Sequence, residues 1–162
     1  MTKSGELLYS EDYEAHPLFH MFFVAVIVLV TYLSLSQFNA RLPRGVQALL
    51  ILVILLLIFL YFSLRTLRIR VTDTDLRVAF GVIGSNIPLS EVLHVKAEKP
   101  SFWRYGGLGI RWGWDRSVGY LMNYGDAVKV IRRRGRAFVF STRNPETVIR
   151  VIENEIKAGE AA

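Results

Sequence analysis

Apolar residues form two long uninterrupted runs early in the chain and short alternating segments after them. The second run, 46–64, contains nineteen residues without a charge. A helix of that length extends about 28 Å, close to the ~30 Å hydrocarbon core of a bilayer. A soluble helix of similar length would keep a polar face, and this run has none. The pattern predicts a membrane-spanning helix.

The first run, 18–35, predicts a second span. The segment before it is acidic, and no small-residue cleavage pattern follows it, which argues against a signal peptide. A ten-residue link, 36–45, makes the pair an antiparallel transmembrane hairpin over 18–64. His20 falls in the first turn of its helix, where it would reach the headgroups; the alternative is a functional group inside the membrane.

Charge sets the expected orientation and compartment. Residues 1–17 carry a net charge of −3 and predict a polar tail, mobile or lying on the surface. Residues 65–162 carry a net charge of +7, whereas the whole chain carries +6. Basic residues tend to lie on the cytoplasmic side of a membrane. The link carries Arg41 and Arg44, whereas the other helix ends are flanked by Lys3, Arg65, Arg68 and Arg70. The larger second group favours a multi-pass inner-membrane protein with both termini in the cytoplasm.

After residue 64 the apolar positions alternate with polar ones. Leu67, Ile69 and Val71 alternate with arginines, as in a half-buried strand. Short strands at similar spacing are expected over 76–80, 93–98, 119–122, 127–131 and 137–141. They predict a small antiparallel sandwich or barrel within a domain over 65–158, giving the chain an α+β class.

One amphipathic helix is predicted to close the chain. Asn144 suits its N-cap and Pro145 its first position, while Val148 and Ile152 recur at i, i+4 on an apolar face. Gly159 is expected to end the helix, leaving 159–162 as a tail. A single amphipathic helix after a series of strands is expected to cover the opening of a half-open barrel.

A family resemblance is carried by several short motifs: Ile87-Pro88-Leu89, Arg104-Tyr105-Gly106-Gly107-Leu108-Gly109-Ile110-Arg111, Ala127-Val128, and Thr142-Arg143-Asn144-Pro145-Glu146. With the hairpin, they resemble the bacterial pleckstrin-homology-like (PH-like) membrane proteins, over residues 18 to about 157. The resemblance implies a seven-stranded barrel-like sheet capped by the C-terminal helix. It transfers no catalytic residues, and Leu108 stands where the signature often has a tryptophan.

The segment 102–114 is rich in glycine and aromatic residues and contains all three tryptophans. In one interpretation, its aromatic side chains, with Ile110, fill the core. In the other, exposed tryptophans bind a protein partner or lie at the membrane interface. The candidate partner-binding residues are Trp103, Tyr105, Arg111, Trp112 and Trp114.

A second candidate site is the basic turn between the last two expected strands. Each cation near an anionic leaflet contributes about 1 kcal/mol to binding, so the turn could contact lipid headgroups; the alternative is a solvated hairpin turn. Its candidate lipid-contacting residues are Arg132, Arg133, Arg134 and Arg136. Nucleic acid is not expected as a partner, because no aromatic stacking platform accompanies the turn.

The sequence gives no sign of a catalytic or metal site. Cysteine is absent, and His16, His20 and His94 stand in separate regions without an H-x-x-x-H pair. We therefore expect no enzyme, no cofactor and no metal. Neither apolar run has a central charge that could serve a transporter's proton relay.

These observations predict a membrane protein whose cytoplasmic PH-like domain is a protein-binding, scaffold or assembly module. Its expected partners are the lipid bilayer and another membrane protein or a second copy of itself. The first alternative is a module that binds anionic lipid headgroups. A membrane enzyme or transporter component is the least favoured alternative.

Overall fold

The computed structural model describes residues 5–38 and 43–161. The fold is α+β, and the chain divides into two compact units. A helical unit comprises Ala15–Arg65, and a β unit contains the chain up to Glu14 and from Thr66 onward.

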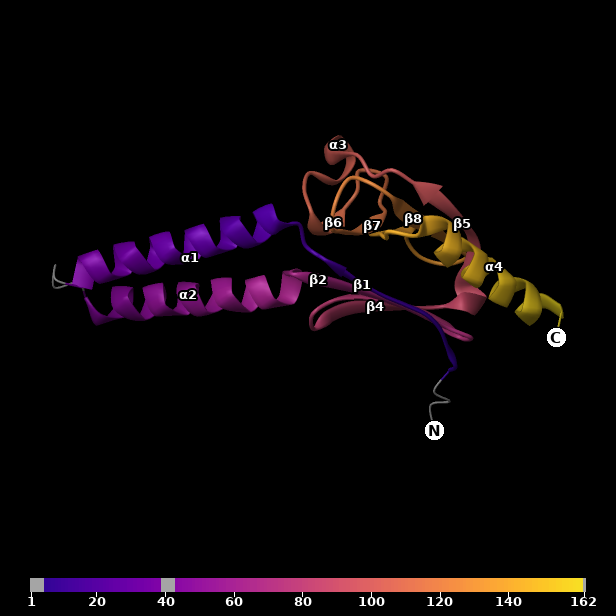
Figure 1. The fold of residues 1–162 in the computed structure, drawn as a ribbon, viewed down its shortest axis with the longest axis horizontal. Coiled ribbons are helices and arrows are strands. Elements are labelled where there is room, and N and C mark those ends of the chain that lie inside the picture. Colours follow the sequence, from indigo (N-terminus) through magenta and orange to yellow (C-terminus); the bar gives the residue numbers. More distant parts are fainter. Residues whose placement is uncertain (1–4, 39–42, 162) are drawn as a thin grey trace. The chain divides into compact units, whose positions relative to one another are not determined.

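The helical unit is a pair of adjacent helices, α1 (Pro17–Phe38) and α2 (Arg44–Leu64) (Figure 1). Near the start of α1, the rings of Phe19 and Phe23 lie 6.4 Å and 5.9 Å from the ring of Tyr61, near the end of α2. The helices are therefore antiparallel, and the predicted pairing of two apolar helices is confirmed. Of the basic residues used to predict its orientation, Arg41 and Lys3 lie outside the described residues.

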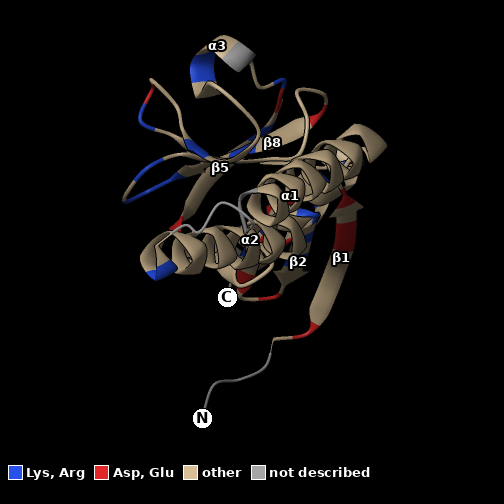
Figure 2. Ribbon diagram, turned by 90° about the vertical axis from the view of Figure 1, so that its left-hand side faces the viewer, with Lys and Arg blue, Asp and Glu red and all other residues tan. Residues whose placement is uncertain are grey.

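The first sheet of the β unit has the order β1-β2-β3-β4 and is antiparallel throughout. Its strands are β1 (Leu7–Glu14), β2 (Thr66–Thr72), β3 (Asp75–Phe80) and β4 (Ile83–Pro88). The predicted polar tail is thus wrong over β1, whose acidic residues are seen in Figure 2. Tyr9, Glu11 and Tyr13 alternate there as the less exposed positions, a period of two in a sequence with few apolar residues.

The second sheet has the order β5-β8-β9-β7-β6. Its strands are β5 (Val92–Glu98), β6 (Gly109–Trp112), β7 (Val118–Leu121), β8 (Ala127–Arg132) and β9 (Phe138–Ser141). The β7–β9 pair is parallel, whereas antiparallel pairing was expected throughout. The described residues form nine strands in two sheets, where the family resemblance implied seven. Two short helices, η1 (Leu89–Glu91) and α3 (Phe102–Tyr105), flank β5.

The two sheets share an apolar core. Phe80 of β3 stacks on Tyr120 of β7 with ring centroids 5.8 Å apart, so residues from both sheets meet directly. The C-terminal helix α4 (Pro145–Ala161) contacts strands of both sheets and buries Val148 and Ile152 completely. The predicted end at Gly159 is wrong, because α4 continues through that residue to Ala161.

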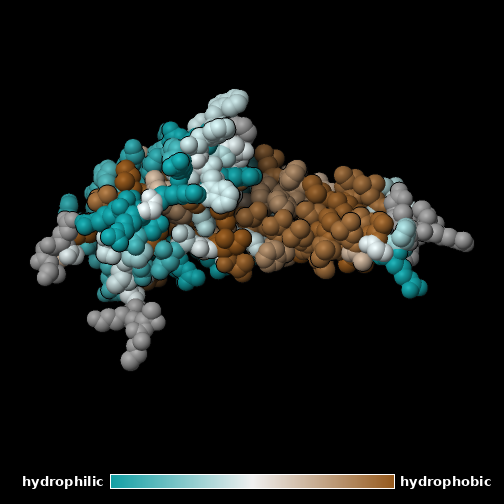
Figure 3. Space-filling view, turned by 180° about the vertical axis from the view of Figure 1, so that it is seen from behind, coloured by the Kyte–Doolittle hydropathy of each residue, from teal (hydrophilic) through white to brown (hydrophobic). Residues whose placement is uncertain are grey.

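The helical unit exposes its apolar side chains. Both helices are long and apolar enough to cross a membrane, and no residue in their most apolar windows is buried (Figure 3). Phe22, Leu35 and Leu52 are each more than 60% exposed. Contiguous apolar surface of this extent is unfavourable in water, so the pair requires an apolar solvent or partner.

Candidate functional site

The structure exposes all three tryptophans of segment 102–114. Trp103, Trp112 and Trp114 have exposed fractions of 85%, 75% and 89%. The core interpretation is therefore wrong for Trp103, and Ile110 is only half-buried. It is correct for Tyr105, which is 4% exposed.

Tyr105 fixes the segment to the second sheet. Its ring lies so close to β7 that a Cβ atom at Gly119 would be 2.9 Å from it. The ring packs in a cluster of buried residues with Leu121, Ala127 and Val139, and the hydroxyl lies 2.8 Å from Ser117 Oγ. Burial raises the pKa of the Tyr105 phenol, which remains a neutral hydrogen-bonding group at physiological pH.

Asp115 extends this contact into a charged network. Its Oδ1 accepts hydrogen bonds from the backbone N–H and hydroxyl of Ser117 at 3.1 and 2.5 Å, and its Oδ2 accepts one from Lys129 Nζ at 3.0 Å. Burial alone would raise the pKa of Asp115, but these bonds outweigh it and lower the pKa to about 2. Lys129 also lies 3.4 Å from Glu98, which forms an ion pair with Arg104.

A backbone hydrogen bond joins the two ends of the segment. The Trp114 N–H donates to the carbonyl of Arg104 at 3.2 Å, which links the turn after β6 to α3. Gly113 suits this turn, because a Cβ there would lie 2.5 Å from Asp115 Oδ1 and 2.7 Å from Ser117 Oγ, and both side chains would have to move. The exposed tryptophans Trp103, Trp112 and Trp114, called here the aromatic surface, are thus carried by a braced scaffold.

Arg111 lies beside the aromatic surface on edge strand β6. Its side chain is exposed, and its Nε donates to the carbonyl of Leu108 at 3.0 Å. This bond orients the guanidinium while leaving the residue accessible. Of the five candidate partner-binding residues, four are therefore exposed, and Tyr105 supports them from the core.

The basic turn between β8 and β9 contains one arginine held by an ion pair, Arg132, and three exposed arginines. Arg132 Nη2 forms an ion pair with Glu91 Oε2 at 2.6 Å, and the Arg133 N–H donates to the carbonyl of Glu91 at 2.7 Å. Arg134 and Arg136 are exposed on either side of Gly135, whose φ of 91° permits the tight turn. Arg132 is therefore partly neutralised within the protein.

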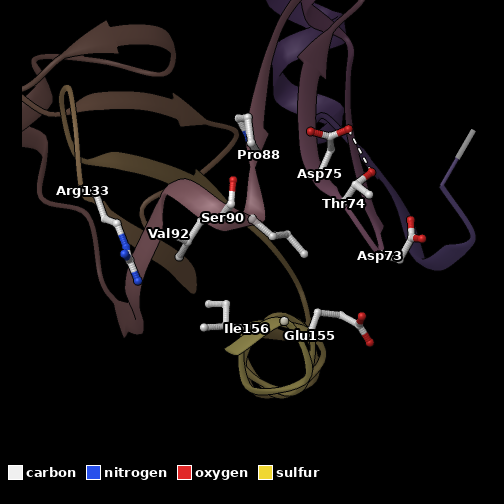
Figure 4. Close-up of a pocket in the computed structure, with 11 residues that line it drawn as sticks. Asp73, Thr74, Asp75, Pro88, Ser90, Val92, Arg133, Glu155 and Ile156 are labelled. Carbon is white, nitrogen blue, oxygen red and sulfur yellow. Dashed lines mark hydrogen bonds between the residues drawn. The ribbon is translucent and has the colours of Figure 1, made fainter. Parts of the chain in front are cut away.

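A cleft of about 540 Å³ lies between α4 and the β2–β3 turn, and sequence reasoning did not indicate it. Figure 4 shows Asp73 and Asp75 on the turn, Glu155 on α4, and Arg133 among its lining residues. Its charged groups come from elements far apart in sequence, so no local motif could signal it. Within 5–38 and 43–161, no group of three histidines or carboxylates could hold a metal ion.

The histidines remain apart in the fold. His20 Nδ1 lies 3.2 Å from the Tyr61 hydroxyl within the helical unit, whereas His94 is exposed on β5. His16 lies just before α1, and its Nδ1 accepts a hydrogen bond at 3.3 Å from the N–H of Leu18 in the first turn of that helix. The three imidazoles do not form a common site.

No protein-family model matches the chain, and no curated protein or solved structure matches it. The likeness to bacterial PH-like proteins therefore stays a prediction.

Proposed function

We propose that this protein spans the inner membrane twice, with both termini in the cytoplasm, and that its β unit is a PH-like sandwich or barrel without enzymatic activity. The β unit is proposed to be a protein-binding, scaffold or assembly module. Two observations support the membrane assignment: α1 and α2 expose apolar side chains, and basic residues such as Arg65 and Arg68 follow α2.

The aromatic surface carries the proposal of a protein partner. Tryptophan is enriched among residues that dominate binding energy, and hot spots work best when a rigid scaffold holds them. Trp112 ends strand β6, Trp114 lies in the turn braced by Asp115, and Trp103 lies on the helix that Tyr105 fixes. The proposed partner is another membrane protein or a second copy of this chain, with Arg111 at the rim of the contact.

Crosslinking in native membranes tests this proposal. The double variant Trp112→Ala/Trp114→Ala should lose the crosslinked product while keeping its thermal unfolding midpoint. Val82→Ala is the matched control, because Val82 is 78% exposed on the same unit but outside the aromatic surface. Unchanged crosslinking in the double variant would exclude this surface as the interface. A tag after Ala162 should be accessible only after permeabilisation; access in intact cells would refute the orientation.

A second candidate function is binding of anionic lipid headgroups by the basic turn. The exposure of Arg134 and Arg136 favours it, whereas the ion pair of Arg132 with Glu91 weakens it. The two apolar helices would hold the full chain in neutral and anionic vesicles alike, so co-flotation with vesicles does not report on the turn. Protection of the turn from protease in anionic but not neutral vesicles tests the contact directly, and equal cleavage in both would exclude it.

A further inference from the structure

Three exposed arginines gather on the outer face of the first sheet. Arg68 and Arg70 alternate along β2, and Arg77 of β3 pairs directly opposite Arg70. Like charges in opposite positions of an antiparallel pair destabilise the sheet. None of the three guanidinium groups forms an ion pair within the described residues, although Asp12 of β1 is paired in register with Arg68. The sheet therefore maintains a local excess of positive charge.

The arginines surround a small hollow. Its lining consists of Arg68, Arg70, Arg77, Ala79 and Gly81, and its volume is about 130 Å³. The residues at the bottom of the hollow have small side chains. Ala79 pairs with Gly84, and a Cβ atom added to Gly84 would lie 2.9 Å from the Cβ atom of Ala79. We call these five lining residues the arginine hollow.

A wider groove continues from this hollow over the same face. It shares Arg70 and Arg77 with the arginine hollow and adds polar residues of β4, among them Ser85 and Asn86. Asn86 pairs in register with Arg77, so amide and guanidinium donors occupy adjacent positions. The face offers donors from several directions around one depression.

The chemistry of these donors selects a class of ligand. Each guanidinium is a rigid fork that binds oxyanions through two parallel hydrogen bonds. A single guanidinium group can bind both oxygens of a planar carboxylate. The oxygens of a tetrahedral phosphate point in several directions, so a phosphate can accept hydrogen bonds from several guanidinium groups at once. A volume of about 130 Å³ leaves room for one phosphate group.

We infer that the arginine hollow is a binding site for a phosphate group. The site lies wholly within the β unit and does not depend on the proposed protein partner. The phosphate can belong to a lipid headgroup or to a soluble compound. Arg68 follows the last residue of α2 by four positions in the chain, so the lipid source is the first to test.

The test uses the full chain in a neutral detergent and titration calorimetry with two probes. One probe is inorganic phosphate, and the other is dihexanoyl phosphatidylglycerol below its micelle concentration. Arg70→Gln/Arg77→Gln should weaken binding about tenfold or more, because charge-assisted hydrogen bonds are lost. The matched control, Lys96→Gln/Arg150→Gln, removes the same charge at exposed positions outside every candidate site and should change binding less than about twofold.

A further variant separates the hollow from bulk charge. Ala79→Leu keeps every arginine but fills the floor, and it should also weaken binding, with its thermal midpoint checked for an intact fold. Binding of the lipid probe alone identifies a headgroup site, and binding of inorganic phosphate identifies a site open to soluble phosphate. No binding of either probe, or equal losses in the two double variants, would overturn the inference.

Discussion

Acidification should weaken the scaffold of the aromatic surface through one carboxylate, Asp115. Its ionised form accepts hydrogen bonds from Ser117 and Lys129, and these bonds lower its pKa from an ordinary 3.8 to about 2. Because the pKa is lower in the folded state, the stabilisation is fully present above pH 3.8. It is lost as the pH falls from about 3.8 through about 2.

The size of the effect follows from the pKa difference and the exposure of the side chain. A shift of nearly two units corresponds to roughly 2.5 kcal/mol at 1.36 kcal/mol per unit. The Asp115 side chain is 35% exposed, however, so solvent screens part of the interaction. We therefore expect about 1 kcal/mol of unfolding free energy to depend on this group.

Tryptophan fluorescence is a local assay for this effect, because all three tryptophans lie within segment 102–114. Denaturant unfolding of the full chain in neutral detergent is compared for the parent protein and Asp115→Asn. At pH 6 the variant should be less stable by about 1 kcal/mol. The difference should shrink as the pH approaches 2.5, because the parent carboxylate takes up a proton on unfolding below its ordinary pKa of 3.8.

The control is Asp126→Asn, which alters an exposed carboxylate that makes no side-chain hydrogen bond within 5–38 and 43–161. It should follow the parent protein across the pH range. A stability difference for Asp115→Asn that stays constant with pH, or a variant more stable than the parent at pH 6, would refute this reasoning.

Two further substitutions test the first sheet. Glu11→Ala removes the acceptors of the Thr142 hydroxyl and the Arg143 N–H, at 2.5 and 2.8 Å, and should cost about 1.5–3 kcal/mol. Hydrogen exchange of the β1 amides should then accelerate, and unchanged protection would contradict this role. Arg77→Gln relieves the repulsion with Arg70 and should stabilise the protein by about 0.2–1 kcal/mol without ligand. A lower thermal midpoint would show that Arg77 is structurally required.

Local periodicity predicted those elements whose burial follows directly from their own sequence. Leu67, Ile69 and Val71 alternate with arginines, and all three are fully buried in β2. Val148 and Ile152 recur at helical spacing and are fully buried in α4. In both cases the apolar face is large enough to determine which side faces the core.

β1 could not be predicted in this way. Its sequence is acidic and has few apolar residues, and its partner β2 lies more than fifty residues further along the chain. The helical hairpin brings the chain back, so that the Ala15 N–H donates to the Arg65 carbonyl at 2.8 Å. Tyr13 can then pair with Leu67. Long-range chain return, rather than local propensity, makes this segment a strand.

The candidate sites show the same division. Composition located the aromatic segment and the basic turn, but it could not tell buried from exposed aromatics. Tyr105 enters the core because its ring covers Gly119, whereas Trp103, two residues earlier on a single helical turn, faces outward. The arginine hollow went unnoticed because Arg70 and Arg77 meet only through strand pairing.

The sequence by itself determined which segments need an apolar environment and which alternate between two faces, because hydrophobicity and side-chain period are local properties. Only the tertiary structure decided which strands pair, which arginines neutralise carboxylates such as Glu91, and which tryptophans remain exposed. These outcomes depend on contacts between residues distant in the chain, whose free energies no single segment contains.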